Sequence, residues 1–198
     1  MKTKKLIAIL LLASLLLSSL LLTACRGQSL TAEEAVDILE RLLPDARILT
    51  VAIYGDGLPY SHDYTEDELD EMFRRTGTVY IPVSSDSPFT SAQAMTDAIS
   101  NIFSADMTLR MRDDAFGRIG QIHPRFRSNE QGWLMINLRR DVFEVMDEIH
   151  LDTLEVTRVR RSVVTTKVYA SREDGDRTQV DIVLIYQGGR WLLDSLAH

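Results

Sequence analysis

The chain has 198 residues, of which 29 are acidic and 22 basic, so its formal net charge is −7, and it contains a single cysteine. The acidic balance argues against a nucleic-acid-binding protein, which needs a basic surface, and against a surface that lies on anionic lipid. One cysteine cannot form a disulfide within the chain, and the length suits one domain with a hydrophobic core.

The N-terminus has the layout of a secretory signal. Residues 1–5, MKTKK, carry three lysines, and no charged residue occurs from Leu6 to Leu22. A positive start followed by an apolar stretch and small residues is typical of a signal peptide. An uncleaved membrane anchor is the alternative, since the stretch reaches the roughly 17 residues that a spanning helix needs. Both interpretations place the rest of the chain outside the cytoplasm.

The residues before the cysteine favour a lipid anchor. Leu22-Thr23-Ala24-Cys25 resembles the lipobox of bacterial lipoproteins. The resemblance implies that residues 1–24 are removed as a signal, that the Cys25 sulfur carries a diacylglycerol, and that the new N-terminus is often acylated, as with palmitate. We therefore expect a lipidated tether over 25–30 and one extracytoplasmic domain over 31–198, held at the cell membrane. The mature net charge would be −10, because the signal contains three lysines and no acid.

Three Ser/Thr-x-x-Glu/Gln boxes predict helix starts in the first half of the domain. In such a box the cap side chain and the third helical residue satisfy each other's backbone N–H groups. The boxes begin at Thr31, Thr65 and Thr90. The expected helices run from 31 to near Pro44, from 65 to Gly77, from 90 to about 103, and, as a short fourth helix, from 104 to about 116.

Strands are expected to dominate the second half. The candidates are residues 48–54, 78–84, 125–130, 133–139, 154–162, 163–171, 178–186 and 190–195. Compact turns containing glycine separate the last three, which is typical of hairpins, and the apolar run 180–186 predicts a central strand. No helix separates the last four strands, so a parallel α/β sheet is not expected. The predicted fold is α+β, with N-terminal helices packed on one face of a curved, mainly antiparallel sheet.

No residue pattern predicts a catalytic site. The chain has no Gly-x-Ser-x-Gly elbow and no glycine-rich phosphate loop with a lysine, although a serine triad without an elbow stays open. Its histidines are far apart, at positions 62, 123, 150 and 198. We therefore expect no catalytic residue, no metal and no cofactor, and we expect lipidation to remove Cys25 from thiol chemistry.

An acidic edge is the candidate partner-binding surface. Asp56, Asp63, Glu66 and Asp67 lie in or beside HDYTEDELDE and the glycine-containing loop before it. A solvated helix face is the alternative for Glu66 and Asp67, because acids in a first helical turn interact favourably with the helix dipole. A cation held by His62 with these acids is less favoured, because the oxygen spacing of calcium loops is absent.

Two further groups have structural interpretations. Arg158, Arg160 and Arg161, with Lys167 on the next strand, form a basic cluster that we expect to pair across strands with acids such as Asp181. The two tryptophans, at 133 and 191, each follow a glycine turn and are expected to anchor the core or close a hairpin.

Residues 77–195 resemble the IseA-type inhibitors of cell-wall DL-endopeptidases. The resemblance is carried by YIPVSSD, by PFTSAQAMTDAISNIFS, by GWLMINL and by the closing GGRWLLDS. The Gly-x-Trp ending also resembles small lipoproteins of the nuclear-transport-factor-like fold. This chain departs from the inhibitors at Gly132-Trp-Leu-Met, where they usually have Gly-Lys-Leu-Tyr, and residues 31–76 have no counterpart. The resemblance implies a location and a class, with no contact residue.

Three functions follow as hypotheses. The first is a non-enzymatic lipoprotein that binds, and restrains, a cell-wall hydrolase or another envelope protein. The second is a lipoprotein that holds a small ligand between the sheet and the helices, and a concavity filled by Phe, Trp and Met side chains would count against it. The third is an unrecognised hydrolase, which a buried Ser–His or His–carboxylate pair would favour.

Overall fold

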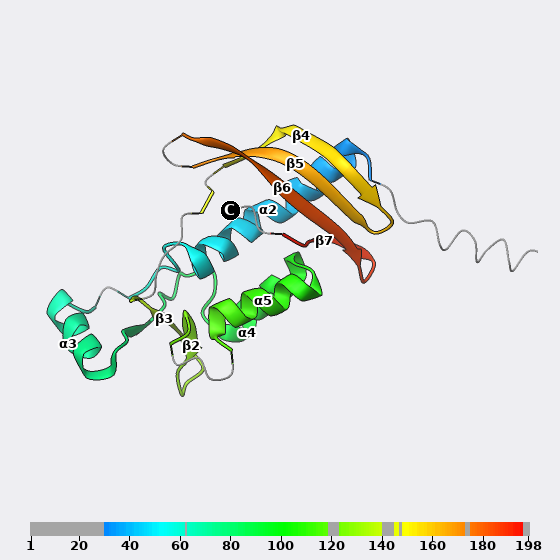
Figure 1. Cartoon of the computed structure of the whole chain (residues 1–198). Coiled ribbons are helices and arrows are strands. Elements are labelled where there is room, and N and C mark those ends of the chain that lie inside the picture. The colour runs from blue at the N-terminus through cyan, green and yellow to red at the C-terminus, as the bar shows by residue number, and fades with distance from the viewer. Residues whose placement is uncertain are drawn as a thin grey trace, which may run out of the picture.

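In the computed structural model, the described residues are 30–61, 63–118, 123–139, 145–146, 148–172 and 175–195. The predicted signal, Cys25, most of the tether, His62 and His198 lie outside them. The described chain forms helices and two antiparallel sheets, so the predicted α+β class is confirmed (Figure 1).

The first helix, α2 (Ala32–Tyr54), begins as predicted and ends later than predicted. The Thr31 side chain accepts from the Glu34 N–H at 3.2 Å, and the Glu34 carboxylate accepts from the Thr31 N–H at 2.8 Å. The helix then passes through Pro44, so the expected end at Pro44 and the expected strand 48–54 are both wrong.

Packing explains why α2 continues past the proline. An internal proline removes one backbone hydrogen bond and costs about 3 kcal/mol, which is less than the burial of several apolar side chains contributes. Pro44 itself is exposed, whereas Ala46, Leu49 and Ile53 beyond it are buried. These three keep the spacing of a helix face, so tertiary contacts outweigh the local penalty.

The other three described helices are short. They are α3 (Glu66–Thr76), α4 (Ala92–Ile102) and α5 (Ala105–Phe116). Thr65 and Gly77 bound α3, and Ser104 caps α5, as the sequence predicts. The cap of α4 is Ser91, one residue later than predicted, because the Thr90 carbonyl accepts from the Leu134 N–H at 2.9 Å and holds that residue outside the helix.

The smaller sheet has the order β1-β3-β2, with β1 (Tyr80–Pro82), β2 (Phe126–Ser128) and β3 (Leu134–Asn137) all antiparallel. The larger sheet is a meander, β4 (Glu148–Arg160), β5 (Val163–Ser171), β6 (Arg177–Gln187) and β7 (Arg190–Leu193). The predicted central strand is confirmed, since β6 lies between β5 and β7. The start predicted at 154 for the first strand of the meander is six residues too late.

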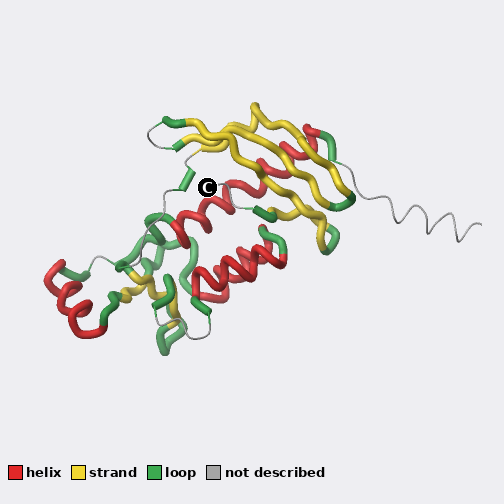
Figure 2. The backbone as a smooth tube through the Cα atoms, viewed as in Figure 1, coloured by secondary structure: helices red, strands yellow, loops and turns green. Residues whose placement is uncertain are grey.

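The long helix α2 lies along one face of the larger sheet, and α4 and α5 lie on the side of α2 that faces away from this sheet (Figure 1, Figure 2). Side chains on β5 alternate between half-exposed and buried, and the buried set includes Val164, Val168 and Ala170. The core therefore lies between this sheet face and the helices, as the predicted layering requires.

The basic cluster pairs only partly as expected. Lys167 lies opposite both Glu155 and Asp181 in the sheet register, whereas Arg158 and Arg160 lie opposite Thr165 and Val163. The register therefore places the lysine between two acids, as the prediction requires, and the two arginines face uncharged residues.

The two tryptophans have different environments. Trp191 is half-buried, and its ring centroid is 5.3 Å from that of Tyr186. Trp133 is 49% exposed, and its backbone N–H donates to the Asn129 side chain at 2.9 Å in the β2–β3 hairpin. Of the two expected roles, Trp133 closes a hairpin and does not anchor the core.

Candidate functional site

A cavity of about 350 Å³ lies between α2 and the buried face of the larger sheet. Its apolar lining is Leu43, Pro44, Ala46, Phe103, Val145, Met146, Ile149, Leu151, Ile182 and Leu193. Its polar lining is Glu40, Arg47, Thr50, Glu148 and Ser195. A volume of this size, a mostly apolar wall and a few polar groups are the usual properties of a small-molecule site.

The helix and the sheet leave this space because their facing side chains are modest in size. The α2 residues that line it recur at positions 40, 43, 47 and 50, which is helix spacing, and Ala46 offers only a methyl group to its wall. Phe103 and Met146 line the cavity without filling it. Large side chains of the described residues therefore do not fill this concavity, and such filling is the observation that would have counted against ligand binding.

The polar residues occupy different depths of the cavity. Glu40 and Arg47 are exposed on α2, and the Glu148 side chain is 70% exposed, so these three lie at the rim. Thr50 is buried, and its hydroxyl donates to the Ala46 carbonyl at 2.8 Å. Ser195 Oγ accepts from the Val183 N–H at 2.9 Å, which places this hydroxyl beside β6. A ligand would therefore meet a charged rim and an almost wholly apolar interior.

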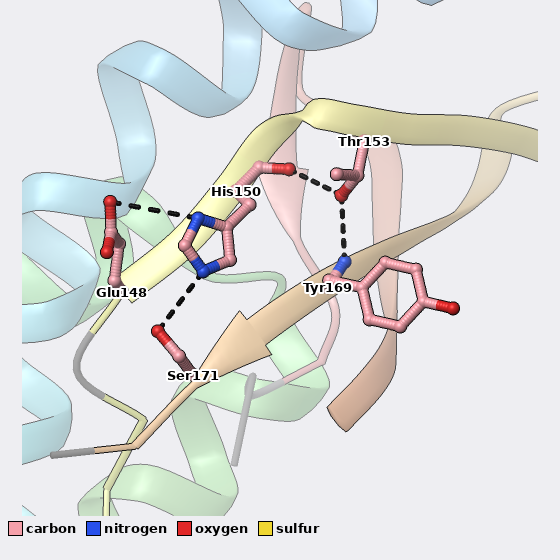
Figure 3. A network of polar contacts seen from close by, with 5 residues as sticks. All are labelled: Glu148, His150, Thr153, Tyr169 and Ser171. Atoms are coloured by element: carbon pink, nitrogen blue, oxygen red, sulfur yellow. Dashed lines mark hydrogen bonds and ion pairs between the residues drawn. The ribbon is translucent and has the colours of Figure 1, made fainter. Parts of the chain in front are cut away.

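A Ser–His pair lies beside the cavity at the start of β4 (Figure 3). His150 Nε2 and Ser171 Oγ are 3.1 Å apart, and His150 Nδ1 is 3.7 Å from a Glu148 carboxylate oxygen. The His150 side chain is only 12% exposed. This is the distance that a serine nucleophile and its general base require, and it is the feature expected to favour a hydrolase.

The described surroundings of the pair do not provide the rest of a catalytic site. Ser171 lies on β5, which pairs with a strand on each side. The Tyr169 N–H donates to Thr153 Oγ1 at 3.0 Å and the Arg172 N–H to the Asp176 carbonyl at 3.1 Å, so neither is available to stabilise an oxyanion. The exposed Glu148 is also too far from the ring for a hydrogen bond.

The same region contains a bulge that Thr153 stabilises. Between His150 and Glu155 the register of β4 against β5 shifts, so the extra residues leave the ladder. Thr153 Oγ1 donates to the His150 carbonyl at 2.6 Å and accepts from the Tyr169 N–H at 3.0 Å (Figure 3). We conclude that this polar network holds the bent end of β4, which forms one wall of the cavity.

The predicted acidic residues lie away from the cavity, on and before α3. Glu66 and Asp67 are exposed in the first turn of α3, Asp63 accepts from the Ser61 hydroxyl, and Asp56 is exposed in the loop after α2. The structure therefore places three of these residues within one short segment, and none lines the cavity.

The helix α3 extends from the body and has no buried residue (Figure 1). An ion pair between Asp70 and Arg139 connects it to the segment after β3, and the Arg139 guanidinium lies 5.3 Å from the Phe73 ring centroid. Phe73 is 42% exposed. An amphipathic helix with this exposure is a surface on which another protein could pack.

The described residues contain neither a cluster of metal ligands nor a membrane-spanning helix. No group of three or more His, Cys, Asp or Glu side chains in that part of the chain is arranged to hold a metal ion. None of the helices described there is both long and apolar enough to span a bilayer.

No protein-family model matches this chain, and no curated protein matches it.

The cavity residues were missed by sequence reasoning because α2 was expected to end at Pro44. Once the helix is continued, Leu43, Ala46 and Thr50 fall on one face, and Ile149, Leu151 and Ile182 are apolar positions on the strands that face it. The hydrophobic spacing across the proline was the available signal.

Proposed function

We propose that this chain is a membrane-anchored extracytoplasmic lipoprotein that binds a small apolar molecule between α2 and the larger sheet. The cavity of about 350 Å³ is the observation that carries the proposal, because ten of its described lining residues are apolar and no described side chain fills it. Such a space is unfavourable for a folded protein to keep, since filling it would gain packing contacts. A ligand offsets that cost.

The location rests on the lipobox resemblance at Cys25. Lipidation would hold the domain at the membrane surface, where apolar molecules concentrate. In a Cys25→Ala protein, we expect no incorporation of labelled lipid at residue 25 and no signal cleavage before it. Normal lipid labelling and anchoring of that variant would overturn the anchor, and it would leave the cavity argument unaffected.

The binding test uses the full-length chain in phosphatidylcholine nanodiscs, labelled at Ile, Leu and Val methyl groups and titrated with 1-octanol. We expect saturable chemical-shift changes at Ile149, Leu151 and Ile182, which line the cavity. Ala46→Phe should abolish them because the added ring occupies the space, whereas Ala32→Phe, at an exposed position of the same helix, should not. Shifts that do not saturate, or that persist unchanged in Ala46→Phe, would refute the proposal.

A second candidate is favoured by α3, and it is the binding of an envelope protein such as a cell-wall hydrolase. The helix presents Phe73 with acidic residues beside it, and no residue of α3 is buried. The residues from Glu66 to Arg75 contribute five acids and two bases, so a partner surface with basic and apolar groups would complement them. The resemblance to IseA-type inhibitors supports the same class of partner.

The test of this second candidate is enzymatic. Full-length protein in nanodiscs is added to a panel of peptidoglycan endopeptidases, and their hydrolysis rates are compared with empty nanodiscs. Inhibition that Phe73→Ala weakens would support the candidate, with Leu109→Ala as a control at another exposed apolar position. Unchanged rates across the panel would remove it.

A further inference from the structure

We infer that the ligand is an amphipathic molecule with a compact apolar body and a cationic, hydrogen-bond-donating head, of which a primary alkylamine is the simplest form. The inference rests on the proposed function, because it assigns the chemistry of the molecule that the cavity between α2 and the sheet would hold. Its basis is the sign and the hydrogen-bonding character of the polar groups at the cavity.

The apolar wall sets the size of the body. At roughly 30 Å³ for each non-hydrogen atom, about 350 Å³ holds about a dozen atoms. The wall is formed by aliphatic side chains from α2, β4, β6 and β7, by Phe103 at the end of α4, and by Val145 and Met146 before β4. A single alkyl chain of about ten carbons, or a compact ring system of that size, would occupy it without leaving polar atoms in apolar surroundings.

Among the described polar residues of the cavity, Glu40 and Glu148 at the rim and the buried Thr50 offer hydrogen-bond acceptors, whereas Arg47 and the Ser195 hydroxyl offer donors. Glu40 and Glu148 both line the cavity and carry carboxylates, which only accept hydrogen bonds when ionised. Thr50 already donates its proton to the Ala46 carbonyl at 2.8 Å, so its oxygen offers lone pairs to a ligand.

Pro44 adds a further acceptor at the same place. In a regular helix the N–H of residue 44 would donate to the Glu40 carbonyl, and proline has no N–H. Glu40 and Pro44 both line the cavity. The Glu40 carbonyl oxygen therefore receives no bond from position 44, and it adds to the negative potential at the rim.

The only basic residue among the described lining residues does not reverse this balance. Arg47 lies on α2 two turns after Glu40, and it already has an interaction of its own. Two carboxylates against one guanidinium leave the described rim negative. A carboxylate head would meet like charge there, whereas an ammonium group would pair with the acids and donate to the free lone pairs.

The test compares three probes with the same eight-carbon alkyl chain and different heads: octylamine, 1-octanol and nonanoate. Each is titrated at pH 7 and low ionic strength into the methyl-labelled full-length chain in nanodiscs, with free probe measured in the aqueous phase. We expect octylamine to bind about five- to tenfold more tightly than nonanoate, with octanol between them, because exposed charge pairs give modest preferences. The preference should shrink at 0.5 M salt, because the Debye screening length is then only about a few ångströms.

Charge-neutralising variants locate the preference. Glu40→Gln and Glu148→Gln should each reduce the amine-to-carboxylate ratio about twofold, and Glu33→Gln, on the same helix outside the cavity lining, should leave it unchanged. Equal affinities, tighter binding of nonanoate, or an amine preference that survives both Gln variants would overturn this inference while the proposed function stands. No saturable binding of any of the three probes would overturn the proposed function itself.

Discussion

The volume of the cavity predicts how affinity should depend on ligand length. Each methylene moved from water into the apolar interior contributes about 0.8 kcal/mol, which is about fourfold in Kd. A cavity of about 350 Å³ is full at about twelve non-hydrogen atoms, so the gain should continue to that length and then stop. In a series from hexylamine to tetradecylamine, the plot of log Kd against chain length should therefore bend near undecylamine.

The position of the bend can be moved by a defined amount. Ala46→Leu adds three carbon atoms at a buried position on the cavity wall, so the bend should move to about nine non-hydrogen atoms. Ala32→Leu makes the same change at an exposed position of α2 and should leave the bend in place. Affinities come from methyl chemical shifts of the full-length chain in nanodiscs. A slope that continues to the end of the series at fifteen non-hydrogen atoms, as in simple partitioning into lipid, would refute the reasoning. So would a bend whose position does not change in Ala46→Leu.

Four further predictions concern stability. Gly57→Ala should lower the free energy of unfolding by about 2 kcal/mol or more, measured by chemical denaturation, because φ is +97° and a Cβ would lie 2.5 Å from an Ile136 methyl group. Thr153→Val should lower it by about 1–3 kcal/mol through the loss of both hydrogen bonds at the β4 bulge, and no change would refute that role. Hydrogen bonds from Thr65 lower the pKa of Glu68 below its ordinary 4.5, so the stabilisation of α3 should be complete above that pH and lost as the pH falls through the lowered pKa. Amide exchange of α3 should therefore accelerate in acid, and a Glu68→Gln protein that accelerates equally would contradict this assignment. Pro44→Ala should raise the free energy of unfolding by about 1–3 kcal/mol and reduce the preference for an amine head, and an unchanged preference would remove the Glu40 carbonyl from the rim argument.

Local patterns predicted most of the elements. The capping boxes at Thr31 and Thr65 start helices, and Gly77 ends one with φ of +72°. These signals work because each depends on neighbours in the chain. The glycine turns near 132 and 188 likewise separate strands as predicted. The α+β class followed from the order of these elements.

The errors arose where distant contacts decide the structure. The run 48–54 is rich in β-branched and aliphatic residues, and alone it indicates a strand. Its actual helical state depends on α2 packing against the larger sheet and α4, which no local pattern encodes. The division of the strands into two sheets is similar, because β1 pairs with β3 across more than fifty residues.

The candidate site was predicted less well than the fold. Sequence reasoning selected charged residues near α3 because charge is visible in a sequence, whereas a cavity is a property of side chains from four separate elements. The pair formed by His150 and Ser171 was equally invisible, since it depends on the register of β4 against β5. The hypothesis of a small ligand named the space between the sheet and the helices, which is where the cavity lies.

Pro44 connects the main error in the fold with the main feature of the site. A proline inside a helix violates a local rule, and proteins tend to keep such violations where function needs them. Here the violation lies on the cavity wall, where it removes one helical hydrogen bond to the Glu40 carbonyl, in a lining that also contains the Glu40 and Glu148 side chains. Alanine at position 44 would give a more stable helix and a less negative electrostatic potential at the cavity rim. Under the proposed function, the cost to α2 is explained as the means by which one turn of helix becomes part of the ligand site.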